Sequence, residues 1–147
     1  MNQKIILAKN IIIFYILIGL PIMYISFDNV INGIILQKNS TVGLGVLSIG
    51  GFVLIPFIIY STYRNSKCIL SENSIKVGTN EYMFQYYDAK VISLEKKITE
   101  RPLFSLFKKH YPHLIITKKD NNEVFLSQAL NCSKNEIELL RNNLPKN

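Results

Sequence analysis

The chain of 147 residues has few of the side chains from which catalytic and metal sites are built. It has no tryptophan, only two histidines and only two cysteines. Cys68 and Cys132 are far apart and belong to no Cys-x-x-Cys pair, so we expect reduced thiols in a small core. The acidic residues are scattered, without the nucleophile, base or paired carboxylates that an enzyme needs.

The two histidines also lack the surroundings of a metal site. His110 and His113 are separated by Tyr111 and Pro112, and proline prevents the regular helix that would align ligands three residues apart. No cysteine or cluster of acids stands nearby in the sequence to complete a coordination shell. We therefore expect a protein that is not an enzyme and that holds neither a metal nor a cofactor.

Two long segments lack charge altogether. Residues 10–27 and 43–60 are uncharged and mostly apolar, and 18 residues of helix measure about 27 Å, close to the hydrocarbon thickness of a bilayer. A chain of this size has no soluble domain large enough to bury such a hairpin, and no signal-peptide cleavage pattern follows the first run. We expect two membrane spans joined by an outer loop at 28–42, with the spans at about residues 5–27 and 43–62.

The basic residues that flank these runs predict their orientation. Lys4 and Lys9 flank the start of the first run, and Arg64 and Lys67 follow the second, whereas the connecting loop has little charge. The positive-inside rule then places both termini in the cytoplasm. The predicted organisation is a transmembrane hairpin at residues 1–63 and a cytoplasmic domain at residues 64–147.

Small side chains in the second run predict close helix packing, because they let two backbones approach. The first run is the simplest neighbour, and a partner helix or a second copy of the chain is the alternative. The residues expected to form this contact are Gly43, Ser48, Gly50 and Gly51.

The cytoplasmic part has the pattern of several short strands followed by a helix. Residues 133–136, Ser-Lys-Asn-Glu, form a capping box, and Leu140 and Leu144 follow on one face of the predicted helix. Turn residues at 120–122 divide the last apolar stretch into two strands. The strand-like runs occur at residues 67–71, 74–78, 81–87, 89–98 and 113–130.

Four stretches after the spans have a pattern that is known from other proteins: "CILSENSIKVG", "FQYYDAKVISLEKK", "HLIITKKDNNEVFLS" and "SKNEIELLRNNL". Together with the double span, they resemble the small bacterial membrane proteins that carry a pleckstrin-homology-like (PH-like) domain. The resemblance implies an α+β membrane protein of the bacterial cytoplasmic (inner) membrane, with a small PH-like β-barrel or sandwich and a C-terminal capping helix. It also implies a binding or scaffolding role without catalytic residues. Tyr86 stands where that family often has tryptophan, and the loop at 99–112 is unusually long.

That loop and its flanks combine positive charge with large apolar side chains, and we name them the basic loop. Anionic lipids of the inner leaflet attract such cations by about 1 kcal/mol each, and apolar side chains can enter the interface. We expect contact with the membrane, while a place in the domain's own core and a protein partner are the alternatives. The residues of the basic loop are Lys96, Lys97, Arg101, Leu103, Phe104, Leu106, Phe107, Lys108 and Lys109.

The sequence thus predicts a non-enzymatic membrane protein whose cytoplasmic domain binds lipid headgroups or a protein partner. Self-association through the spans is a further possibility. The alternative function is an immunity or accessory protein that acts on a membrane-targeting toxin or a membrane complex. We do not expect nucleic acid as a partner, because no motif that reads bases accompanies the basic and aromatic residues.

Overall fold

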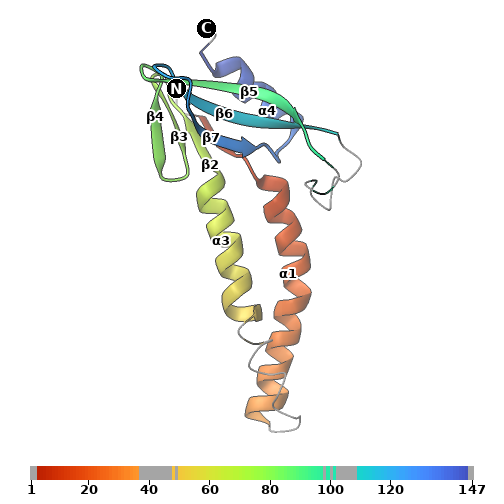
Figure 1. Cartoon of the computed structure of the whole chain (residues 1–147). Coiled ribbons are helices and arrows are strands. Elements are labelled where there is room, and N and C mark those ends of the chain that lie inside the picture. Colours follow the sequence, from red (N-terminus) through yellow and green to blue (C-terminus); the bar gives the residue numbers. More distant parts are fainter. Residues whose placement is uncertain are drawn as a thin grey trace. The chain divides into compact units, whose positions relative to one another are not determined.

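The computed structural model describes residues 3–36, 48, 50–97, 99, 101 and 109–145. The protein is an α+β protein with an apolar helix near its N-terminus and two antiparallel sheets (Figure 1). By its internal contacts the chain divides into a sheet unit, Met1–Ala8 with Ser66–Asn147, and a helical unit, Lys9–Asn65.

The helical unit contains an apolar helix of membrane-spanning length. The helix α1 (Lys9–Asn29) continues into a π-helical segment, η1 (Val30–Ile35). Within the described part of the chain, one helix, Lys9–Asn32, is long and apolar enough to cross a membrane, and only 11% of its apolar window is buried. The predicted second span lies partly outside the described residues, and its described part consists of η3 (Gly50–Leu54) and α3 (Ile55–Ser66).

The sheet unit is built from two antiparallel meanders. The first sheet has the order β1-β2-β3-β4, formed by β1 (Gln3–Ile6), β2 (Lys67–Leu70), β3 (Ser74–Val77) and β4 (Asn80–Met83). The second sheet has the order β5-β6-β7, formed by β5 (Tyr87–Glu95), β6 (His110–Lys118) and β7 (Val124–Ala129). The last helix, α4 (Lys134–Asn143), contacts β5.

The local signals of the sequence correspond to these elements. Ser133 caps α4 as predicted: its backbone N–H donates to Glu136 Oε2 at 2.9 Å, and its Oγ accepts from the Glu136 backbone N–H at 3.3 Å. The predicted turn at 120–122 contains Asn122 with φ 57°, a left-handed conformation that asparagine tolerates. The run at 81–87 is shorter than expected as a strand, because β4 ends at Met83 and the chain turns before β5.

The first residues of the chain correct the sequence-based interpretation. We expected Ile5 to Ala8 to extend the first span, but Gln3–Ile6 is a strand and α1 begins at Lys9. This strand pairs with β2, with Gln3 opposite Leu70. The pairing gives the backbone groups of β1 hydrogen-bond partners and places Ile5 and Leu7 in the core, which explains why these residues form a strand here.

The core of the sheet unit joins both sheets to α4. Ile75 of β3, Leu114 and Ile116 of β6 and Leu140 of α4 are at most 1% exposed. Leu7 is equally buried and belongs to the same cluster, although it follows β1 at the start of the chain. The N-terminal residues are therefore part of the folded core of the sheet unit.

We predict that Leu7→Ala destabilises the sheet unit by about 2–5 kcal/mol, because it leaves a cavity in this core. The measurement is the denaturant dependence of alkylation of the buried Cys68 thiol, with the full-length protein in mild detergent. The matched control is Leu139→Ala on α4, where the side chain is 38% exposed and a change within about 0.5 kcal/mol is expected. Equal effects of the two variants would contradict a core position for Leu7.

Candidate functional site

The chain enters and leaves the helical unit at two residues that are hydrogen-bonded to each other. The backbone N–H of Leu7 donates to the carbonyl oxygen of Ser66 at 2.8 Å, which continues the pairing of β1 with β2. The carbonyl oxygen of Leu7 accepts from the N–H of Asn131 at 2.7 Å. Ser66 is 1% exposed, so both ends of the insertion are held inside the sheet unit. We name Leu7 and Ser66 the exit point.

The base of the basic loop lies at the same end of the sheet unit as the exit point. Asn131 contacts Leu7, and its neighbour Leu130 donates its N–H to the carbonyl oxygen of Pro112 near the start of β6 at 2.8 Å. Beyond the ends of β5 and β6, the N–H of Lys96 donates to the carbonyl oxygen of Lys109 at 3.1 Å. The loop therefore leaves the second sheet near the place where the chain passes to the helical unit.

The described cations of the basic loop are arranged around this base. Lys97 and Lys109 are exposed, while the ammonium of Lys96 lies 5.5 Å from the centre of the Tyr111 ring, a cation–π contact. Arg101 donates from Nε to the carbonyl oxygen of Lys96 at 3.0 Å, which holds this arginine close to the base. Five predicted members of the loop lie outside the described residues: Leu103, Phe104, Leu106, Phe107 and Lys108.

The two histidines are separated by the strand on which they lie. His110 is exposed at the start of β6, whereas His113 is 5% exposed and its Nδ1 lies 2.9 Å from the carbonyl oxygen of Tyr111. Residues three apart on a strand point to opposite faces, so the two rings do not converge. In the described ranges, no three His, Cys, Asp or Glu side chains are close enough to hold a metal ion.

The two cysteines are core residues of the sheet unit. Cys68 is fully buried and Cys132 is 8% exposed, and they form no disulfide with each other. Burial, with a smaller effect from Cys132, raises the pKa of the Cys68 thiol to about 12. The thiolate is the reactive form of cysteine, so Cys68 is a poor nucleophile at neutral pH.

A pocket of about 550 Å³ with mixed polar and apolar walls opens between the β2–β3 turn, β4 and Pro145. Its wall includes Glu72 and Glu81, and Oγ of Ser74 donates to Oε1 of Glu81 at 2.7 Å. Neither a histidine nor a cysteine lines it. The hydrogen bond from Ser74 fixes the carboxylate of Glu81 in the pocket wall.

The small residues of the helical unit make close contacts between α1 and the second run. A Cβ added to Gly51 would collide with the side chain of Ser26, and one added to Gly19 would lie 2.6 Å from Cγ2 of Ile55. Among the described residues, no atom lies within 4 Å of a Cβ added to Gly50, so the methyl group meets open space there. Gly43 lies outside the described residues, and the hydroxyl of Ser48 is buried without a hydrogen-bond partner among the described atoms.

The sequence analysis missed half of this contact, since it considered only the second run. Gly19 and Ser26 are seven residues apart, which places them on one face of α1, and both are buried. A search of the first run for small residues at this spacing would have found them. The hydroxyl of Ser26 donates to the carbonyl oxygen of Ile22 at 2.8 Å, so the serine adds no unsatisfied polar group to an apolar helix.

Neither a protein-family model nor a curated protein nor a solved structure matches the chain.

We predict that Gly51→Ala weakens the packing of the helical unit by about 1–3 kcal/mol, because the new methyl group has no room beside Ser26. The measurement is unfolding of the full-length protein in detergent, followed by circular dichroism of the helices. Gly50→Ala is the matched control and is expected to be neutral or stabilising by up to about 1 kcal/mol. Ser26→Gly should restore part of the loss in Gly51→Ala, and equal behaviour of both glycine variants would contradict the contact.

Proposed function

We propose that this is a non-enzymatic protein of the bacterial cytoplasmic membrane. In this proposal two helices anchor it as a hairpin, and the sheet unit is a cytoplasmic PH-like domain. The basic loop of that domain binds the headgroups of anionic lipids in the inner leaflet.

The properties of α1 support a retained membrane helix. The core helix of a soluble protein and a signal sequence can have the same length and composition. A core helix would be mostly buried, whereas Leu17 and Tyr24 are 64% and 73% exposed. Removal of a signal sequence would take β1 with it, and the core of the sheet unit would lose Ile5 and Leu7.

The exit point is the observation that carries the proposal of a hairpin. Since Leu7 and Ser66 are hydrogen-bonded, the sheet unit holds both ends of the chain segment between them. If α1 crosses a bilayer, the chain must cross back before it reaches β2. The apolar residues of η3 and α3 are the segment available for the return. Lys4, Lys9, Arg64 and Lys67 then lie on one side, which the positive-inside rule identifies as the cytoplasm.

The location of the basic loop supports lipid headgroups as its ligand. Its base is linked by hydrogen bonds to the end of the sheet unit from which both helices leave. A membrane anchored through those helices would be near this end, and about 1 kcal/mol per basic residue is available from an anionic leaflet. The expected six strands and final helix occur in their predicted order, with β1 added before them, which supports the PH-like interpretation.

Cysteine labelling in intact cells tests the hairpin. We expect Asn39→Cys, in the predicted outer loop, to react with a membrane-impermeant maleimide added outside. Lys76→Cys, at an exposed position of β3, should react only after the cells are permeabilised. The two natural thiols are buried and provide a low background. Reaction of Lys76→Cys in intact cells would contradict the orientation.

A single tryptophan tests the contact of the basic loop with lipid, because the chain has none of its own. We expect fluorescence of Phe104→Trp to be quenched by brominated phosphatidylglycerol in nanodiscs of the full-length protein. Replacement of Lys96, Lys97, Arg101 and Lys109 by glutamine should reduce this quenching, because four attractions of about 1 kcal/mol each are removed.

The matched control is Tyr86→Trp, an exposed position before β5 and therefore at the opposite end of that strand from the loop. It should be quenched little in the same nanodiscs. No quenching at position 104 would contradict contact of the loop with the leaflet, and equal quenching at positions 86 and 104 would contradict a contact that is specific to the loop end of the domain.

A further inference from the structure

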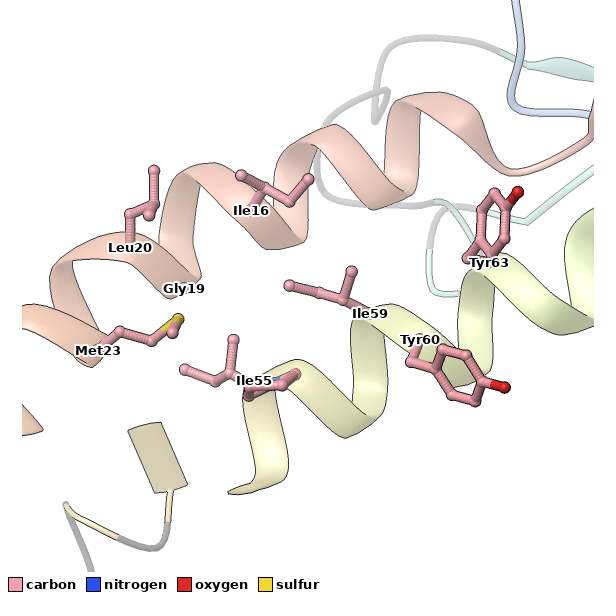
Figure 2. A pocket seen from close by; sticks show the side chains of 9 residues that line it. Ile16, Gly19, Leu20, Met23, Ile55, Ile59, Tyr60 and Tyr63 are labelled. Atoms are coloured by element: carbon pink, nitrogen blue, oxygen red, sulfur yellow. The ribbon is translucent and has the colours of Figure 1, made fainter. Parts of the chain in front are cut away.

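An apolar groove runs along the helical unit between α1 and α3. It has a volume of about 480 Å³, within the usual range of ligand pockets, and almost wholly apolar walls. Figure 2 shows Met23 of α1 and Ile55 and Ile59 of α3 pointing into the space between the two helices. Leu20 and Tyr63 also line the groove.

The groove occupies only part of the length of the helix pair. The two helices are antiparallel, because Gly19 meets Ile55 and the later Ser26 meets the earlier Gly51. The contact of Ser26 with Gly51 brings the backbones together beyond the groove, on the side away from Lys9 and Asn65. From Ile55 to Tyr63 the groove measures about 12 Å at the rise of an α-helix. This is close to the roughly 15 Å of hydrocarbon in one leaflet.

Polar and cationic groups mark the other end of the groove. Lys9 lies seven residues before Ile16, so it continues the groove-lining face of α1 by two helical turns. Tyr63 lines the groove on α3 and is followed by the exposed cation of Arg64. Tyrosine and snorkelling basic residues are typical of the level at which lipid headgroups begin.

We propose that this groove binds one acyl chain of an anionic phospholipid, with the lipid phosphate at the level of Lys9, Tyr63 and Arg64. The inference rests on the proposed membrane location and adds a specific lipid site within the hairpin. A groove of one leaflet's depth, closed at one end and cationic at the other, fits a lipid chain with its headgroup. A transmembrane partner helix packs closely where small residues let the backbones approach, whereas large apolar side chains line most of this groove.

Native mass spectrometry of the full-length protein, released from mild detergent, tests the site. The probes are phosphatidylglycerol and phosphatidylcholine with identical acyl chains. We expect a one-to-one adduct that favours phosphatidylglycerol by roughly fivefold or more, as one cation near the phosphate would give. Lys9→Gln should reduce this preference, and Lys9→Gln combined with Arg64→Gln should abolish it, whereas Lys76→Gln, which removes a charge from β3, should retain it.

The acyl-chain position is tested by filling the groove. Leu20→Trp should reduce binding of both lipids at least tenfold, because the indole would occupy the space of the chain. Leu17→Trp is the matched control: Leu17 lies on the same helix, is 64% exposed and lines neither this groove nor the smaller apolar pocket beside Ile22. Equal losses in the two variants, or an adduct without headgroup preference, would overturn the proposal.

Two further results separate this inference from the proposed function. A protein that is found in the membrane fraction with the expected cysteine labelling, but forms no phosphatidylglycerol adduct, would overturn the lipid site alone. A protein that is absent from the membrane fraction would overturn both. A dimer that Leu20→Trp converts to a monomer would assign the groove to a second copy of the chain and also overturn the lipid site.

Discussion

The pairing of β1 with β2 is the constraint on which the rest of the molecule depends. Four residues near the start of the chain add a strand to a sheet whose other strands begin at Lys67. The pairing buries Ile5 and Leu7, and the burial of one such side chain is worth about 1.5–3 kcal/mol. Its last hydrogen bond, from Leu7 to Ser66, joins the two ends of a long apolar insertion. Because of this pairing, the insertion is a loop of the sheet unit with both ends fixed.

Closing that loop has an entropic cost, which membrane insertion would reduce. Bringing together the ends of a flexible segment of roughly 60 residues costs about 3–4 kcal/mol, apart from a constant term. If the helices pack first through Gly19 and Gly51, they bring the ends of the segment near Leu7 and Ser66 closer together before β1 meets β2. Most of the closure cost is then met by helix packing, and the short strand β1 needs to supply only its local pairing energy. In that order of events, the close glycine contacts of the helical unit would also help the sheet unit to fold.

Local signals made most of the fold predictable, whereas long-range partners did not. The capping box at Ser133 and the turn at Asn122 depend on neighbours within a few residues, so their chemistry can be read from the sequence. The strand at Gln3–Ile6 has its partner more than sixty residues away, and its apolar residues run directly into those of α1. Hydropathy cannot separate a buried strand from the start of a span when no turn residue stands between them.

In the candidate site, too, the sequence predicted which residue types are present but not which residues they contact. The cations of the basic loop were evident from the sequence, but the neighbourhood of the loop's base and the exit point depends on hydrogen bonds of Leu130 and Asn131. Neither residue has a side chain that would indicate a functional role from the sequence alone. Similarly, the glycines of the second run were evident, but their importance differs because Gly51 meets Ser26 while Gly50 faces open space. A residue type predicts the kind of contact that a side chain can make. Which residue it contacts is determined by the fold.

The exit point also connects the two proposed lipid contacts through the chain itself. Lys9 is two residues from Leu7 and Arg64 is two residues from Ser66, while the base of the basic loop is joined to Leu7 through Asn131. Each set of cations is therefore only a few covalent or hydrogen-bonded steps from the same two residues. If the proposed leaflet lies at the level of the exit point, the attractions of these cations to it would add to one another. In the proposed hairpin, charge placed this way would set the orientation by the positive-inside rule and would attract anionic lipid to the opening of the groove. The same few lysines and arginines can thus serve first to orient the chain and then to recruit its ligand.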